Sequence, residues 1–187
     1  MDTAVSPAAP APSTEPVAWK RWFLPALIAV LVADLVSKAV IFARYDEGQD
    51  VAWWCELAWN PGVAWGLGGA FPGAVLALTL ILIPILTAVW WYTYRREGAP
   101  ANLAFGLILG GALGNAYDRV MTALVGEAGG YQGVRDFIRI DLRILGIDYT
   151  WPNFNLADSA ITVGFILLIL SPWILRFTNR DRTTHAR

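Results

Sequence analysis

The sequence predicts an all-α membrane protein that crosses the bilayer four times. Of its 187 residues, 56% are hydrophobic and only 16% are charged, and the mean hydropathy is +0.47. Soluble domains contain about 45–50% apolar and about 25% charged residues. The excess apolar residues occur in blocks, and eight basic residues next to the blocks fall on one side of the predicted membrane, against four arginines in the segments on the other side (Arg44, Arg135, Arg139 and Arg143). We therefore divide the chain into a tail (1–17), a membrane domain (18–177) and a second tail (178–187).

The N-terminal part combines a tail with a first span that contains charges. Residues 1–17 are rich in Pro, Ala, Ser and Thr without periodicity, which predicts a disordered tail. The first apolar block, 22–43, contains Asp34 and Lys38 four positions apart, a spacing that allows an ion pair on one helix face. Burying either charge alone costs about 2.5–3.5 kcal/mol on insertion scales, so we expect a structural pair. These charges, and the lack of basic residues in the tail, argue against a cleaved signal peptide.

Three further apolar blocks occupy residues 71–92, 101–121 and 158–176. The last two are short for a span of roughly 20 residues, so two spans with two buried helices is an alternative. The charge distribution favours four spans, because eight basic residues at the ends of the blocks then fall in the same compartment. They are Lys20, Arg21, Arg95, Arg96, Arg176, Arg180, Arg182 and Arg187. By the positive-inside rule this side, with both termini, is cytoplasmic.

The two longer connecting segments, 44–70 and 122–157, then lie outside the cytoplasm. Residues 51–54 and 137–142 have strand-like composition, the second with alternation. A short sheet on the membrane surface and irregular loops held by aromatic residues both fit this composition. The tryptophans that suit the membrane interface are Trp53, Trp54, Trp59, Trp65 and Trp151.

Histidine and cysteine usage excludes several kinds of catalytic site. The single histidine, His185, is third from the end, and the single cysteine is Cys55. An intrachain disulfide cannot form, and a Ser-His-Asp triad, a Cys-His pair or a His-Glu-x-x-His zinc site lacks its histidine. A hydrolase with this sequence would use carboxylates, and we expect no metal. The net charge of −1 gives no basic surface for nucleic acid.

Polar residues gather at the predicted outer end of the third block. Asn115 precedes Asp118 by three positions and Arg119 by four, so the three share one helix face. A structural clamp near the interface and a functional site are both open for Asp118. The planar fork of Arg119 suits a substrate carbonyl or carboxylate. Before this end, Gly106, Gly110 and Gly114 repeat at the spacing of close helix packing.

Four more polar residues lie on the same predicted side. Asn60, in an Asn-Pro-Gly turn, could hold a peptide backbone or merely close the turn. Asn155 and Asp158 stand where the last block begins, so Asp158 could be a helix cap. Asp136 lies in the preceding connecting segment. Two carboxylates that meet across one water are the minimum for acid–base hydrolysis, which makes Asp136 and Asp158 the candidate pair.

These residues occur in strings that together resemble bacterial lipoprotein signal peptidase (signal peptidase II). The resemblance runs in order from about residue 22 to 175 and comprises the Asp34/Lys38 pair, NPGVAWG (60–66), GGALGNAYDR (110–119), VRDFI (134–138) and FNLADSA (154–160). It implies four transmembrane helices with a small extracytoplasmic β-cradle. It also implies substrates that are prolipoproteins with diacylglycerol on a cysteine, cut just before that cysteine.

The resemblance further implies the residue assignments. Asp136 and Asp158 would be the catalytic aspartates, with no metal or organic cofactor. The substrate-orienting residues would be Asn60, Asn115, Arg119 and Asn155, supported by Asp34, Lys38 and Asp118. We expect a monomer in the bacterial plasma (inner) membrane, in contact with membrane lipid, with its active site on the extracytoplasmic side.

Two departures and two alternatives accompany this hypothesis. Residues 120–133 form a longer link than the family usually has, and Arg135 stands where an aliphatic residue is usual. Asp118 is therefore a rival to Asp136 as the partner of Asp158. A small ion- or proton-coupled transporter could use Asp34, Lys38, Asp118 and Arg119 as its path. A membrane scaffold would explain the spans and the glycines but not the outer polar cluster.

Overall fold

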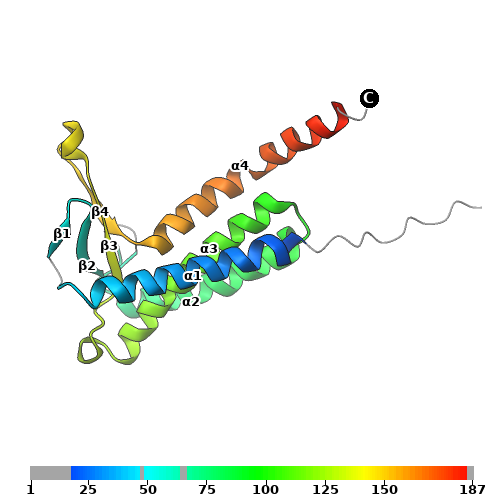
Figure 1. The fold of residues 1–187 in the computed structure, drawn as a ribbon. Coiled ribbons are helices and arrows are strands. Elements are labelled where there is room, and N and C mark those ends of the chain that lie inside the picture. The colour runs from blue at the N-terminus through cyan, green and yellow to red at the C-terminus, as the bar shows by residue number, and fades with distance from the viewer. Residues whose placement is uncertain (1–17, 47–48, 64–66, 185–187) are drawn as a thin grey trace, which may run out of the picture.

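The computed structural model describes residues 18–46, 49–63 and 67–184 and contains four long helices (Figure 1). They are α1 (Ala18–Phe42), α2 (Pro72–Val89), α3 (Ala99–Leu124) and α4 (Leu156–Thr184). A π-helical turn, η2 (Trp90–Tyr94), continues α2. The predicted disordered tail, 1–17, lies outside the described residues, as do 185–187 of the second tail. Residues 178–184 of that tail continue α4.

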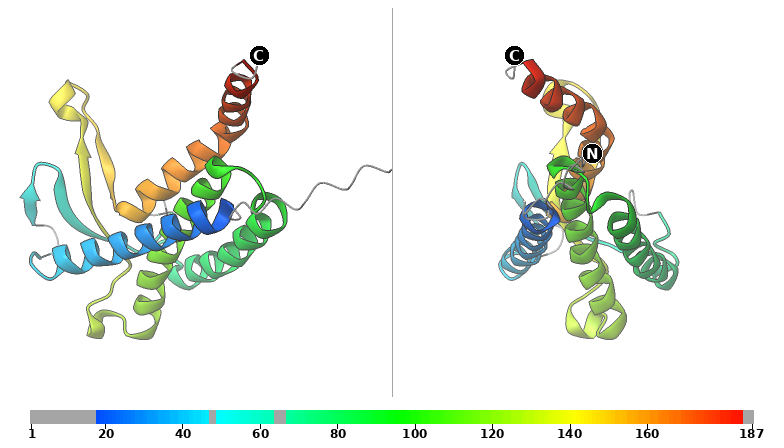
Figure 2. Two further views of the ribbon diagram at one scale, coloured as in Figure 1. Left: turned by 45° about the vertical axis from the view of Figure 1, so that its right-hand side comes forward. Right: turned by 90° about the vertical axis from the view of Figure 1, so that its right-hand side faces the viewer.

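Three helical segments in the described part of the chain have the length and composition of membrane spans. They are Trp19–Phe42, Pro72–Tyr94 and Leu156–Ile174. Helix α3 is not among them, so the fourth predicted span remains a prediction. The physical reason is its position: α3 packs against α1, α2 and α4 and lies between them in Figure 2. A helix that faces protein instead of lipid can carry glycine and buried polar residues.

Glycines bring α3 close to its neighbours, as the four-residue spacing predicts. A Cβ atom at Gly106 would lie 2.6 Å from the carbonyl oxygen of Phe23 in α1. A Cβ at Gly111 would clash with the carbonyl of Ala157 at the start of α4, and one at Gly114 with the Asp34 carboxylate. These contacts set the positions of α1 and α4 relative to α3.

The connecting segments form a four-stranded antiparallel sheet in the order β1-β2-β3-β4, at one end of the helices (Figure 1). The strands are β1 (Asp50–Ala52), β2 (Cys55–Asn60), β3 (Val134–Asp141) and β4 (Thr150–Phe154). The sheet, one of the two alternatives left open by composition, is therefore present. The boundaries differ from prediction: residues 53–54 turn between β1 and β2, and β2 and β4 were not predicted.

Two apolar clusters hold these parts together. The first joins Phe23, Trp90, Phe105 and Leu109 among α1, η2 and α3. The second, around Cys55, Leu57 and Phe137 of the sheet, packs against Ile41 and Phe42 at the end of α1. The sheet is thus attached to the helix ends, which places β3 beside the first turn of α4.

The remaining segments are two short 3₁₀ turns. One, η3 (Glu127–Gly129), follows α3, whose last turn extends to Leu124 and so takes up part of the long 120–133 link. The other, η4 (Leu142–Leu145), lies between β3 and β4. It begins directly after Asp141, whose carboxylate accepts a hydrogen bond from the Arg143 backbone N–H.

Candidate active site

Asp158 is held in the first turn of α4 by a reciprocal cap with Asn155. The Asn155 side-chain oxygen accepts from the Asp158 N–H at 2.9 Å, and the Asp158 carboxylate accepts from the Asn155 N–H at 3.2 Å. This is the arrangement of a capping box, with Asn155 as the cap and Asp158 three positions later. The residue that caps α4 is therefore Asn155. Asp158, which the sequence offered as a possible cap, is the residue in the first turn that pairs with it.

The same asparagine also contacts Asp136 on β3. Its side-chain nitrogen donates to Asp136 Oδ1 at 2.7 Å. The Asn60 side chain, from the neighbouring strand β2, donates to Asp136 Oδ2 at 3.1 Å. From α3, the Asn115 side chain donates to Asp158 Oδ1 at 2.8 Å. Each aspartate thus accepts a hydrogen bond from Asn155 and one from a further asparagine. Asn155 therefore links the two carboxylates.

A buried lysine ties this pair to α1. Lys38 Nζ lies 2.7 Å from Asp34 Oδ2 and donates to Asn115 Oδ1 at 3.0 Å. The predicted Asp34–Lys38 ion pair is present, with both side chains fully buried. The other oxygen of Asp34 accepts from the Ala157 N–H at 3.0 Å. Helix α1 therefore supports the first turn of α4, in which Asp158 stands.

Asp118 is enclosed by cations. Its Oδ2 lies 3.2 Å from Lys38 Nζ, and its Oδ1 lies 2.7 Å from Arg135 Nη2. The carboxylate also accepts from Arg135 Nε at 3.0 Å and from the Arg135 backbone N–H at 3.1 Å. Asp118 is fully buried and, within the described residues, makes no hydrogen bond to Asp158 or Asp136. This geometry fits a structural clamp better than membership of the pair.

Arg119 and Asn60 border the open side of the site. Arg119 Nη2 donates to the Gly62 carbonyl at 2.9 Å, while its buried Nε has no hydrogen-bond partner in the described part of the chain. The Asn60 side-chain oxygen accepts from the Gly62 N–H at 3.0 Å, so Asn60 closes its turn while its side-chain nitrogen donates to Asp136. Turn closure, one of the two possibilities considered for Asn60, is therefore present, and a contact with a peptide backbone stays a prediction.

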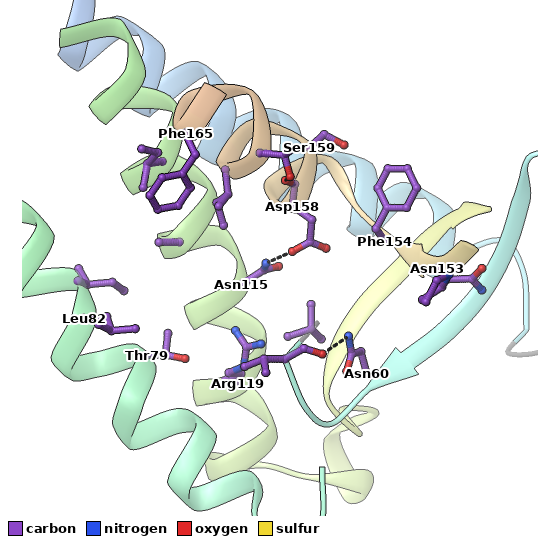
Figure 3. Close-up of a pocket in the computed structure, with 18 of the residues that line it drawn as sticks. Asn60, Thr79, Leu82, Asn115, Arg119, Asn153, Phe154, Asp158, Ser159 and Phe165 are labelled. Atoms are coloured by element: carbon purple, nitrogen blue, oxygen red, sulfur yellow. Dashed lines mark hydrogen bonds between the residues drawn. The ribbon is translucent and has the colours of Figure 1, made fainter. Parts of the chain in front are cut away.

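A cavity of about 640 Å³ opens from these groups between α2, α3, α4 and the sheet (Figure 3). Asn60, Asn115, Arg119 and Asp158 line its polar part, and Figure 3 shows Asn115 and Asp158 side by side. The apolar wall consists of Leu82, Ile83, Leu86, Ile108, Ala112, Ile161 and Phe165. The cavity therefore accepts a ligand with one polar and one apolar part.

The electrostatics distinguish Asp136 as the more deeply placed carboxyl. Asp136 is 2% exposed, and burial followed by the nearby charge of Asp158 raises its pKa to about 7. The hydrogen bonds from Asn60 and Asn155 and the charge of Lys38 oppose this rise. Two close carboxylates disfavour double ionisation, so near neutral pH the pair tends to hold one proton.

Sequence reasoning missed several residues of the site. It did not find Thr162 and Phe165, which line the cavity four and seven positions after Asp158. That spacing marks a single helix face and could have revealed them. It also gave no partner for Arg135, because the contact with Asp118 joins β3 to α3 through the tertiary fold.

Apolar helices, a largely apolar cavity and two carboxylates joined by one asparagine define the class: a membrane peptidase of the aspartic type. The model of the family Signal peptidase (SPase) II matches residues 26–174. The chain belongs to this family, which confirms the resemblance found in the sequence. The chain is thus a hydrolase, and the comparisons do not support the transporter alternative.

Individual relatives agree with this assignment. The chain is 31% identical to the lipoprotein signal peptidase of Aquifex aeolicus over 169 residues, which covers 86% of this chain and 93% of the relative. It is 35% identical to that of Chlorobium phaeovibrioides over 162 residues, with 80% and 89% covered.

Solved structures of a bacterial membrane enzyme, determined by the in meso method, have a similar fold. The one at 2.3 Å has a TM-score of 0.62 and 26% identity, with 84% of this chain and 93% of that chain covered. The one at 1.9 Å has a TM-score of 0.60 and 30% identity, with 80% and 94% covered.

Proposed function

We propose that the chain is a membrane aspartic endopeptidase that removes signal peptides from diacylglyceryl-modified prolipoproteins, cutting before the lipidated cysteine. The chain belongs to the signal peptidase II family, and its relatives are named lipoprotein signal peptidases. One observation carries the catalytic assignment: Asn155 hydrogen-bonds both Asp136 and Asp158, and Asp158 lines the polar end of a largely apolar cavity.

The two aspartates act on one water. The ionised carboxylate takes a proton from the water, and the resulting hydroxide attacks the scissile carbonyl. The protonated carboxyl donates a hydrogen bond to the carbonyl oxygen and later helps to protonate the leaving amine. The pair titrates as a unit, and the resting proton belongs mainly to Asp136, since burial raises its pKa to about 7. Asp158, which lines the cavity, is then the base that faces the water.

The rest of the site positions the substrate. The unpartnered Nε of Arg119 is a donor for a carbonyl oxygen of the signal peptide. Asn115 and Asn155 hold the carboxylates at the polar end of the cavity. The acyl chains of the lipidated cysteine would lie along the apolar wall that α2, α3 and α4 form. The lipid and the peptide bond are thereby held by opposite parts of one cavity.

The proposed topology has four spans, with both termini in the cytoplasm and the sheet and active site on the extracytoplasmic side of the bacterial inner membrane. Helix α3 contains 26 residues, which at about 1.5 Å per residue exceeds the roughly 30 Å of hydrocarbon. It lies alongside three apolar helices of sufficient length. Because α3 is buried among the other helices, it can carry polar residues. The proposed functional unit is a monomer.

The test is turnover of a diacylglyceryl-modified prolipoprotein by the purified enzyme in detergent. Asp136→Asn and Asp158→Asn should each lower kcat by at least about 100-fold, because each removes a proton-transfer group. Asp141→Asn is the matched control, since Asp141 ends the same strand β3 and pairs with Arg143 outside the site. It should retain the parent rate.

The variant Asp118→Asn distinguishes the proposed pair, Asp136 and Asp158, from the rival pair, Asp118 and Asp158. It should lower the melting temperature, because Lys38 and Arg135 lose their common carboxylate. Should folded Asp118→Asn be inactive while Asp136→Asn turns over at the parent rate, the pair would be Asp118 and Asp158 instead. Parent-level turnover by Asp158→Asn would reject the aspartic mechanism.

A further inference from the structure

Arg135, directly before Asp136 on β3, places a buried positive charge next to the catalytic pair. Arg135 is 7% exposed. Its guanidinium contacts Asp118 through Nη2 at 2.7 Å and Nε at 3.0 Å, and its backbone N–H donates to the other Asp118 oxygen at 3.1 Å. The ring of Tyr131 lies 5.3 Å from the guanidinium carbon. Both the side chain and the backbone of Arg135 are therefore anchored to α3.

The buried charges balance only when Arg135 is counted. Asp34 and Asp118 both contact Lys38, so a single ammonium would otherwise serve two buried carboxylates. Arg135 supplies the second cation, at Asp118. On the cavity side, Arg119 offsets one negative charge of the pair, which is the charge that remains when the pair holds one proton. An unpaired buried charge is costly, so each member depends on the others.

Lys38 connects these buried charges to Asp158 through Asn115. Its ammonium donates to Asn115 Oδ1 at 3.0 Å, and Asn115 donates to Asp158 Oδ1 at 2.8 Å. If Asp118 had no second cation, it would attract Lys38 away from Asn115. The Arg135 carbonyl also accepts from the Asn155 side chain at 3.3 Å, the same group that donates to Asp136. Arg135 thus acts on both aspartates without contacting either carboxylate in the structure.

We infer that Arg135 is a positioning residue that neutralises Asp118, so that Lys38 stays on Asn115 and the aspartate pair keeps its geometry and its shared proton. The inference rests on the proposed function of Asp136 and Asp158. It assigns Arg135 no contact with substrate.

The inference has a signature in the pH dependence of turnover. Asp136 faces Asn60 of β2, Asn155 and Asp158 beside α4, Lys38 of α1 and Arg119 of α3. Removal of the Arg135 charge leaves this surrounding more negative. A more negative surrounding favours protonated carboxyls, so both limbs of the pH profile move to higher pH. Loss of packing alone would lower stability and leave the limbs in place.

The experiment compares Arg135→Met and Arg135→Lys with the parent in detergent, using a diacylglyceryl-modified prolipoprotein. For Arg135→Met we expect kcat to fall by about tenfold or more, with KM within about twofold, and both limbs of the pH profile to move upward. Arg135→Lys restores the charge but not the two-point contact with Asp118. It should return the limbs to the parent positions and recover part of kcat.

Unmoved limbs in folded Arg135→Met, or a raised KM with unchanged kcat, would overturn the inference. If Arg135→Met does not fold, the double variant Arg135→Met/Asp118→Asn replaces it, because this variant removes both partners of the ion pair. Folding of the double variant with the parent limbs supports charge compensation, whereas failure to fold or shifted limbs overturns it. Asp136→Asn is measured alongside: its activity would reject the proposed function, while its inactivity with unmoved Arg135→Met limbs rejects only this inference.

Discussion

At the scale of single residues, Asn155 shows why the site uses amides around its carboxylates. One Asn155 side chain donates to Asp136 and accepts from the Asp158 N–H. An aspartate at this position could accept but not donate, and it would add a third negative charge to the pair. An amide is both donor and acceptor and carries no charge. The same argument applies to Asn115, which accepts from Lys38 and donates to Asp158.

Asp136 should make the protein less stable as pH rises toward neutral. Its folded pKa, about 7, lies above its ordinary value of 3.8, so between these values the folded state binds more protons than the unfolded state. The free energy of unfolding therefore falls with rising pH, by at most about 1.4 kcal/mol per pH unit from this group. Asp136→Asn should lack this contribution.

Thermal unfolding at pH values from 4 to 8 checks this prediction. The melting temperature of Asp136→Asn minus that of the parent should increase from pH 4 to pH 7 and level off above. A difference that is constant over this range would contradict the raised pKa. Asp141→Asn is the control, because hydrogen bonds from Arg143 lower the pKa of Asp141 and its contribution to stability therefore changes mainly below pH 4.

At the scale of elements, α3 determines the site through its closest contacts. Gly111 faces the Ala157 carbonyl, one residue before Asp158, and Gly114 faces Asp34, whose carboxylate accepts from the Ala157 N–H. Two glycines of one helix therefore hold the first turn of α4 in place. Close packing, the interpretation preferred for the glycine repeat, is present, and this packing also positions Asp158, the proposed catalytic residue.

Gly111→Ala should consequently impair both folding and catalysis. The added methyl group must push the Ala157 carbonyl away, which typically costs about 1–3 kcal/mol for overpacking and shifts Asp158 from Asn115. Gly73→Ala is the matched control, because a Cβ at Gly73 in α2 meets no atom within 4 Å. We expect a lower melting temperature and lower kcat for Gly111→Ala only. Parent-like kcat in Gly111→Ala would show that α4 adjusts without moving Asp158.

At the scale of the whole molecule, the sheet and the chain reversal between η2 and α3 lie at opposite ends of the helices (Figure 1). Arg96 lies at that reversal, before α3, and Glu127 follows α3 on the side of the sheet. If α3 spans the membrane, these two residues are in different compartments. The positive-inside rule places Arg96 in the cytoplasm.

Cysteine labelling tests this topology. In a Cys55→Ala background, Glu127→Cys should react with a membrane-impermeant maleimide in intact spheroplasts, and Arg96→Cys only after permeabilisation. Both positions are exposed, so unequal labelling reports the membrane and not burial. Labelling of both without permeabilisation would rule out the four-span topology.

Local sequence predicted the helices and the polar residues that gather at the candidate site. Apolar blocks must be helical in lipid, because every backbone polar group needs an internal partner. The polar residues between them had few possible locations except the helix ends, where Asn60, Asn115, Asn155, Asp136 and Asp158 indeed form one hydrogen-bonded network.

The arrangement of those residues around the two aspartates follows from the tertiary fold. Strand pairing depends on partners far along the chain, so β2 and β4 could not be recognised from their own residues. The separation of Asp118 from the pair depends on Lys38 and Arg135, which approach it from α1 and β3. The sequence specifies where a carboxylate stands in the chain. Its proton affinity and its access to substrate depend on the charges and apolar side chains that the fold brings around it from distant parts of the chain.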